Sequence, residues 1–307
     1  MQDCVFIFPG QGSQSLHMLA GLHAVFPQIT TTFNEASHVL GYDLWHLVTD
    51  GPEALLNDTR YTQPAILTAS IALWRIWCDQ AASPPLAVAG HSLGEYSALV
   101  AAGALAFEDA VGLVAKRGEF MQQAVPEGLG AMAAVLGLSD AEVIAICERA
   151  KEGEVLSAVN FNAPGQVVIA GHKTAVMRAL QLVKEQGKRA LVLPVSVPSH
   201  CALMHSAASR LEEVLTTITI NAPHIPVFSN VDAQAHHSIK AIKEALVKQL
   251  YSPVLWVQTI EALALQSSTF IECGPGKVLT GLNKRINATL NTYPLCEPDL
   301  LRTALQL

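Results

Sequence analysis

Residues 85–94 read PLAVAGHSLG. The apolar run 85–89 predicts a buried strand, and the residues from Glu95 to Ala102 are compatible with a helix. Between them, Gly90-His91-Ser92-Leu93-Gly94 has the form G-x-S-x-G, which is typical of a sharp turn that projects a serine hydroxyl beyond its strand. A glycine-rich turn with an incidental serine is the simpler alternative. The elements expected on both sides favour Ser92 as a nucleophile.

Similar strand ends lie near both termini. Val5 to Phe8 is an apolar run followed at once by Pro9-Gly10-Gln11-Gly12, and Phe270 to Cys273 leads into a Gly-Pro-Gly turn. The segment from Pro64 to Cys78 has helical spacing. Buried strands that alternate with helices are typical of a parallel α/β core. The later turn is not a phosphate-binding loop, because Val278 stands where that loop needs Ser or Thr.

A different order of elements begins near Pro126. It is strand, helix, strand, strand, helix, strand, which is the ferredoxin-like arrangement. The expected ranges are 132–136, 139–150 (opened by a capping box from Ser139 to Glu142), 155–159, 166–170, 174–186 (capped by Thr174) and 189–193. The prediction is therefore a large α/β-hydrolase-like domain with a parallel sheet core, residues 1–125 and 197–307, and a small inserted ferredoxin-like subdomain, residues 126–196.

Composition excludes several classes of protein. Of the 307 residues, 50% are hydrophobic and 15% are charged, which is ample material for a large core. The net charge of −7 argues against a nucleic-acid binder. No apolar run approaches the roughly 18 residues of a membrane span, and no targeting segment is visible. Six scattered cysteines without a C-x-x-C pair fit free thiols in the cytoplasm.

A serine nucleophile needs a base. Among 11 histidines, His200 follows an apolar strand end and a turn that Pro198 restrains. His91 is too close to Ser92 along the chain to aim easily at its hydroxyl. The pair His236-His237 lies in a polar stretch with no third metal ligand suggested. Spacing alone leaves open whether His200 is a base or a buried, hydrogen-bonded residue.

Seven motifs in order resemble the malonyl-CoA:acyl carrier protein transacylases of fatty acid synthesis and, more distantly, the acyltransferase domains of polyketide synthases. The resemblance covers nearly the whole chain. Each motif is weak alone, and the set is specific because of its order and spacing. The motifs are Phe8 to Gln14, Gly90 to Gly94, Lys116 to Gly118, Val159 to Gln166, Val197 to His200, Gln249 to Val254 and Gly274 to Leu279.

The resemblance implies catalytic roles for five residues. Ser92 would attack a malonyl thioester, and His200 would be its general base. The main-chain carbonyl of Gln249 would orient the histidine in place of a carboxylate. The backbone N–H groups of Gln11 and Leu93 would form the oxyanion hole, and each such donor contributes about 2.7–4 kcal/mol of barrier lowering.

The resemblance also implies a site for the acyl group. Arg117 would bind the free carboxylate of the malonyl group, because a planar guanidinium makes two parallel bonds to a carboxylate. An exposed basic pair, Lys116-Arg117, is the alternative that composition favours. Met132 and Ser199 are expected to line the acyl pocket, and Asn162 to bind near it or to brace the loop beneath it.

The implied partners are malonyl-CoA and, transiently, an acyl carrier protein, bound by a monomer with no metal or redox cofactor, no nucleic acid and no membrane. Carrier proteins of this kind are acidic, whereas this chain is negative overall, so docking predicts a local basic patch. Lys188-Arg189 and Lys284-Arg285 are the candidates.

Two other functions use the same residues. A serine thioesterase or esterase would share Ser92 and His200 but would not need Arg117 for neutral acyl chains. A non-catalytic interaction protein would not require Gln11, Ser92, Arg117 and His200 together. Within the transferase hypothesis, other carboxylated acyl groups remain possible substrates.

Overall fold

Strand β1 (Val5–Phe8) occupies the middle of a five-stranded sheet in the computed structural model, which describes residues 3–80, 84–195 and 197–306. The strand order is β7-β2-β1-β8-β9, and every pairing is parallel. The other strands are β2 (Ala87–Gly90), β7 (Val227–Phe228), β8 (Thr269–Glu272) and β9 (Asn291–Pro294). In a parallel sheet the carboxyl ends of the strands share one edge, so the loops after β1, β2 and β7 meet there.

Helices cover both faces of this sheet, as expected for strands that are apolar throughout. Phe6 and Phe8 pack with the helices of one face, while Val5 and Ile7 pack with those of the other. The first face carries α2 (Pro27–Leu40), α5 (Thr59–Gln80), α6 (Gly94–Ala101), α7 (Phe107–Ala124), α10 (His205–Thr217) and α11 (Ile239–Gln249). The second carries α12 (Trp256–Ala264) and α13 (Val278–Ile286). Shorter helices are α1 (Ala20–His23), α3 (Leu44–Asp50), α4 (Glu53–Leu56), α14 (Pro298–Ala304) and the 3-10 turn η1 (Ala202–Met204).

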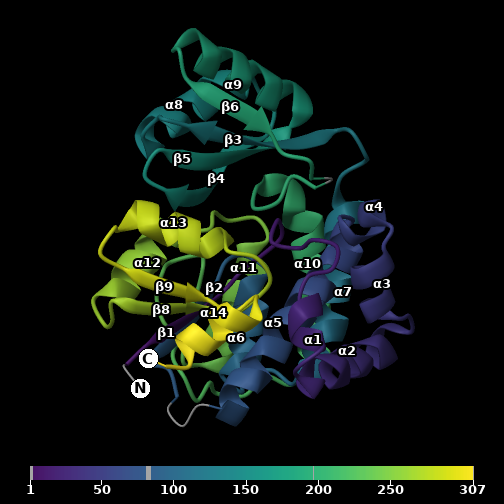
Figure 1. The fold of residues 1–307 in the computed structure, drawn as a ribbon. Helices are drawn as coiled ribbons and strands as arrows, with labels where there is room; N and C mark the ends of the chain where they lie inside the picture. Colours follow the sequence, from purple (N-terminus) through teal and green to yellow (C-terminus); the bar gives the residue numbers. More distant parts are fainter. Residues whose placement is uncertain (1–2, 81–83, 196, 307) are drawn as a thin grey trace.

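A second, antiparallel sheet stands apart from the first (Figure 1). Its order is β4-β5-β3-β6, and α8 and α9 cover its outer face. The elements are β3 (Gly130–Leu136), α8 (Asp140–Ala150), β4 (Leu156–Ala163), β5 (Gln166–His172), α9 (Lys173–Glu185) and β6 (Arg189–Val192). Along β3, Ala133 and Val135 pack beneath the helices, so Met132, between Ala131 and Ala133, points to the opposite face, toward the large sheet.

The two parts touch along β4. The N–H of Phe161 donates to the carbonyl of Val254, and the N–H of Val254 donates to the carbonyl of Val159, at 3.0 and 2.8 Å. Arg285 of α13 also donates to the side chain of Gln166 in the small sheet. These contacts join the small sheet to α13 and to the segment that leads into α12.

The predicted mixed α/β fold with a parallel core and a separate antiparallel sheet is confirmed. The capping box of Ser139 and Glu142 is present. The cap assigned to Thr174 is wrong: α9 begins after His172, and the Thr174 hydroxyl donates to Glu154 instead. The subdomain boundary expected at residue 196 lies outside the described residues. Within the described ranges, no helix is both long and apolar enough to span a bilayer.

Two glycines allow β1, β2 and α6 to approach closely. A Cβ atom on Gly90 would lie 1.9 Å from the carbonyl carbon of Gly94. A Cβ atom on Gly94 would lie 2.0 Å from the carbonyl oxygen of Phe8. Both obstacles are backbone atoms, which cannot rotate away. The sharp turn between β2 and α6 therefore requires glycine at both ends.

We expect Gly94→Ala to lower the free energy of unfolding by more than about 3 kcal/mol, because the backbone of β1 must move to admit the methyl group. Urea denaturation followed by circular dichroism measures this change. Gly281→Ala is the control, since the helical Gly281 of α13 has no atom within 4 Å of a new Cβ and alanine favours helix by up to about 1 kcal/mol. Equal stability of the two variants would contradict the steric argument.

Candidate active site

Ser92 lies at the tip of the turn between β2 and α6, with a φ of 51°. This left-handed conformation is strained for a residue with a side chain, and surrounding contacts must hold it. Asn230, just after β7, supplies two of them. Its Oδ1 accepts from the N–H of Ser92 at 2.6 Å, and its Nδ2 donates to the carbonyl of Gly90 at 2.6 Å. The amide of Asn230 thus clamps both sides of the turn.

The imidazole of His200 contacts the hydroxyl of Ser92. Its Nε2 lies 2.8 Å from the Oγ of Ser92, and its Nδ1 lies 2.7 Å from the main-chain carbonyl oxygen of Gln249. A carbonyl oxygen only accepts, so Nδ1 carries the proton and Nε2 is free to accept from the serine hydroxyl. Burial and the positive charge of Arg117 lower the pKa of His200 to about 3. The imidazole is therefore neutral, as a general base must be.

Arg117 is not the exposed member of a basic pair, because only 1% of its surface is accessible. Its Nη1 donates to the Oε1 of Gln63 at 2.9 Å, and its Nη2 donates to the Oε1 of Gln249 at 2.8 Å. The same Nη2 lies 3.4 Å from the Oγ of Ser92. Both strong acceptors are neutral amides, and no ion pair of Arg117 occurs among the described residues. Its charge is thus available to an anionic ligand beside the serine.

Gln11 and Leu93 approach the serine from two loops. Gln11 follows β1, and its side chain donates to the hydroxyl of Thr59 at 3.2 Å. Leu93 is the residue after Ser92 and opens α6. Among the hydrogen bonds of the described residues, none uses the backbone N–H of Gln11 or of Leu93. These two donors fit the requirement for an oxyanion hole.

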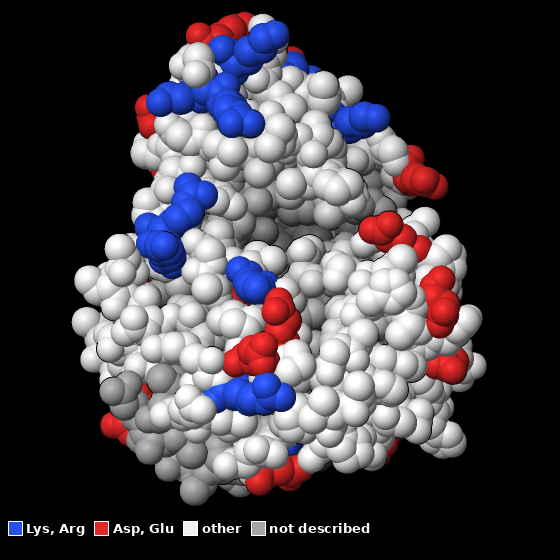
Figure 2. Space-filling model, in the orientation of Figure 1, with Lys and Arg blue, Asp and Glu red and all other residues white. Residues whose placement is uncertain are grey.

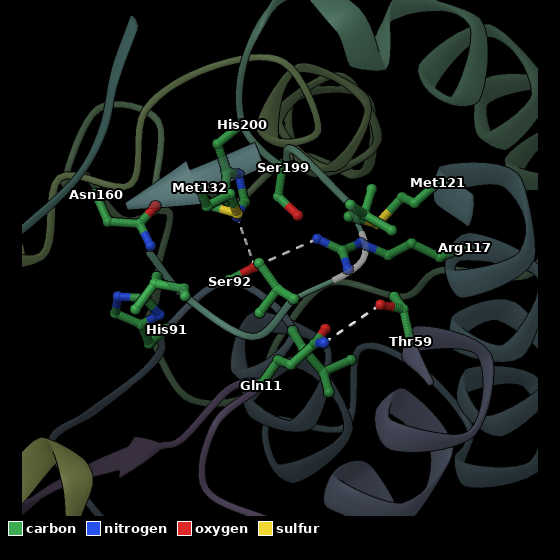
Figure 3. A pocket seen from close by; sticks show the side chains of 14 residues that line it. Gln11, Thr59, His91, Ser92, Arg117, Met121, Met132, Asn160, Ser199 and His200 are labelled. Atoms are coloured by element: carbon green, nitrogen blue, oxygen red, sulfur yellow. Dashed lines mark hydrogen bonds between the residues drawn. The ribbon is translucent and has the colours of Figure 1, made fainter. Parts of the chain in front are cut away.

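One pocket between the two sheets is lined by Gln11, Ser92, Leu93, Arg117 and His200 (Figure 3). Met132 enters it from β3, and Ser199 lies beside His200. Asn162 does not line it, and its Oδ1 lies 2.7 Å from the Nε2 of His91. Asn160, two residues earlier on β4, lines the pocket instead. The pairing of β4 with β5 is irregular between Phe161 and Ala163, so the regular alternation of a strand does not predict where Asn162 lies.

Three further polar residues support the site. The sequence indicates a supporting role for Gln63, because the stretch Thr62 to Ala65 fits the family resemblance, but its motifs do not mark Asn230 or Glu95. Asn230 braces the turn, Gln63 holds Arg117, and Glu95 is a buried carboxyl behind Gln249. Glu95 directly follows the G-x-S-x-G motif, which is the one available signal. The described residues contain no cluster of three metal-binding side chains, and His236 pairs with Asp232 at 3.0 Å.

Comparisons with known proteins agree with this geometry. The acyl transferase domain family matches residues 5–291. A malonyl CoA-acyl carrier protein transacylase of Escherichia coli K12 is 57% identical over 309 residues, covering 100% of both chains. The solved structure of the transacylase from Coxiella burnetii is 50% identical with a TM-score of 0.98, covering 99% of this chain and 97% of that one. A type II polyketide synthase acyl-carrier protein in complex with its malonyl-transacylase gives 52% identity, a TM-score of 0.98 and 99% coverage of both chains.

The depressed pKa of His200 predicts reactivity in acid. A histidine base works only while it is neutral, that is, above its pKa, so labelling of Ser92 by a fluorophosphonate should persist well below the ordinary histidine pKa of about 6.5. Arg117→Met removes a positive charge that lowers this pKa. The acid limb of the labelling rate should therefore move to higher pH in that variant. Rates measured from about pH 8 down to below the wild-type pKa of His200, about 3, test this, and superimposable limbs would contradict the assigned coupling.

Proposed function

The chain belongs to the acyl transferase domain family and is related over its full length to malonyl-CoA:acyl carrier protein transacylases, and from this premise we propose how its site works. The reaction transfers the malonyl group of malonyl-CoA to the thiol of an acyl carrier protein, a step of fatty acid synthesis. After coenzyme A has left and before the carrier protein reacts, the malonyl group is bound to Ser92 as an ester.

The observation that supports this proposal is the buried guanidinium of Arg117 at 3.4 Å from the Oγ of Ser92. A malonyl group has a thioester carbon and a carboxylate separated by one methylene. A carboxylate held by the guanidinium therefore leaves the thioester carbon near the serine oxygen. Neutral acyl chains, which a simple thioesterase or esterase hydrolyses, would leave this cation without a counterion in a buried site.

In the first half-reaction, His200 Nε2 takes the proton of Ser92 while the serine oxygen attacks the thioester carbon. The carbonyl oxygen becomes an oxyanion, which the N–H groups of Gln11 and Leu93 stabilise. The carbon–sulfur bond then breaks. His200 returns the proton to the sulfur, coenzyme A leaves as a thiol, and a malonyl ester remains on Ser92.

The second half-reaction reverses these steps with a different thiol. The phosphopantetheine thiol of the carrier protein gives its proton to His200 and attacks the ester carbon. The same two N–H groups stabilise the second oxyanion, and Ser92 leaves after taking the proton back from His200. The product is the malonyl thioester of the carrier protein. Every proton and bond is accounted for by the two substrates and the side chains named, so we propose no cofactor.

The finer description of the architecture belongs to the same proposal. The order β4-β5-β3-β6 with α8 and α9 on one face supports a ferredoxin-like subdomain of residues 126–196 inserted in an α/β-hydrolase-like domain of residues 1–125 and 197–307. One chain supplies every site residue, which supports a monomer. Six free cysteines support a cytoplasmic location.

Intact mass after acid quenching tests the proposal directly. The wild type should gain a malonyl group from malonyl-CoA and little acetyl group from acetyl-CoA, and Ser92→Ala should gain neither. Carrier protein should then discharge the adduct. Equal labelling by both donors would contradict the role of Arg117. Release of free malonate without an acceptor would identify a hydrolase, and absence of any adduct would contradict the nucleophile.

Carrier-protein docking is proposed for the basic side of the pocket entrance. Figure 2 shows basic side chains over α9 and β6 and a second group over α13, on the same side of the hollow between the two sheets. Lys188, Arg189, Lys284 and Arg285 are all exposed. Arg285 also bridges to the small sheet through the carbonyl of Pro164 at 3.3 Å. Because Arg285 has this structural contact, Lys284 is the cleaner probe of charge on α13.

We expect Lys188→Glu/Arg189→Glu and Lys284→Glu to raise the KM for carrier protein several-fold, because an acidic partner would then meet like charge. Malonylation of Ser92 by malonyl-CoA should not change. Lys240→Glu is the control. Lys240 is exposed near the N-terminal end of α11, whereas Gln249 is the last residue of that helix. Unchanged carrier-protein kinetics in both charge reversals would remove these patches from the docking surface.

A further inference from the structure

Glu95 is a buried carboxyl that the reaction as written does not use. It is the second residue of α6, and 3% of its surface is accessible. Burial raises the pKa of this carboxyl, while the hydrogen bonds from Gln249 and Asn230 act in the opposite direction by stabilising the carboxylate. A carboxyl group is costly to bury without hydrogen-bond partners, so the contacts of Glu95 indicate what it holds in place.

Both contacts lead to the active site. The Oε2 of Glu95 accepts from the Nε2 of Gln249 at 2.7 Å and from the backbone N–H of Asn230 at 3.2 Å. Asn230 clamps the turn that carries Ser92. Gln249 orients His200 through its main-chain carbonyl and contacts Arg117 through its side chain.

The side-chain amide of Gln249 has a donor end and an acceptor end, and Glu95 determines which way it points. The Nε2 end donates to Glu95 and to the carbonyl of Ser92 at 3.0 Å. The Oε1 end is thereby left facing the Nη2 of Arg117. If the amide turned over, its N–H₂ group would face the guanidinium, donor against donor, and Arg117 would lose an acceptor.

We propose that Glu95 is a positioning residue that acts through the side chain of Gln249 on Arg117 and so sets the preference for a carboxylated acyl group. The inference rests on the proposed function, in which Arg117 binds the malonyl carboxylate.

The neutral amide between Glu95 and Arg117 explains how the clamp stays open. A carboxylate in direct contact with the guanidinium would occupy the nitrogen atoms that the substrate needs. One amide further away, a carboxylate still stabilises the buried cation before substrate arrives, while the guanidinium continues to line the pocket beside Ser92. The amide of Gln249 thus separates the two charges and leaves the guanidinium in the pocket lining.

The test compares two reactions of Ser92 in Glu95→Gln. Malonylation by malonyl-CoA needs Arg117, whereas labelling by an uncharged fluorophosphonate needs only the serine and its base. The malonylation rate constant should fall roughly 10- to 100-fold. The donors of Gln249 and Asn230 share one oxygen of Glu95, and the neutral oxygen of a glutamine accepts from them about half as strongly as a carboxylate oxygen does. Labelling should change less than about threefold. Equal losses in both reactions, or full malonylation, would overturn the proposal.

Glu272→Gln is the matched control. Glu272 is a fully buried glutamate at the end of β8 whose carboxylate accepts from Leu279 and Thr280. It lies outside the pocket lining, so its substitution should leave the ratio of malonylation to labelling unchanged. If Glu95→Gln does not fold, Glu95→Asp withdraws the carboxylate by one methylene and carries the same comparison.

A double-mutant cycle tests the route through Gln249. Gln249→Met removes both ends of the amide but keeps the main-chain carbonyl that orients His200. In that background Glu95→Gln should cause no further loss of malonylation, and additive losses would overturn the proposal. A wild type that shows no preference for malonyl-CoA over acetyl-CoA would instead refute the proposed function itself. A wild type with that preference and an unaltered Glu95→Gln would refute only the role of Glu95.

Discussion

The close approach of β1, β2 and α6 is the constraint on which the rest of the site depends. Only glycine fits at 90 and 94, because any side chain there would meet backbone at about 2 Å. This packing produces the abrupt turn that forces Ser92 into a left-handed conformation and holds it at the edge of the sheet. The loops that follow β1 and β7 end at that same edge. The strand order alone therefore places Gln11 and Asn230 beside the serine.

A second constraint is electrostatic. The site buries a guanidinium but contacts it with amide oxygens from Gln63 and Gln249, so the cation is hydrogen-bonded without being neutralised. Burial lowers the pKa of His200, and the field of Arg117 lowers it further, so the base is neutral. One buried charge therefore contributes to the protonation state of the base and, in the proposed function, also recognises a carboxylate.

The sequence predicted the parallel core and the elements of the separate antiparallel sheet because apolar runs and turn residues are local signals. A local signal failed at Thr174, which the sequence predicted to cap a helix. Its hydroxyl donates instead to Glu154, twenty residues away along the chain. The motifs also named residues that the structure brings together around Ser92. Glu95 and Asn230 escaped notice because their importance lies in contacts across more than 130 residues of chain, which no spacing rule encodes.

The use of a main-chain carbonyl to orient His200 follows from the same electrostatics. An aspartate in that place would bury an anion in the same site as Arg117. Its charge would weaken the attraction of the guanidinium for a malonyl carboxylate and would raise the pKa of the histidine. A carbonyl oxygen fixes the tautomer of His200 equally well and carries no charge. A serine enzyme that must bind an anionic acyl group beside its nucleophile is therefore driven toward a neutral acceptor for its histidine, and the carboxylate it retains, Glu95, stands one amide away.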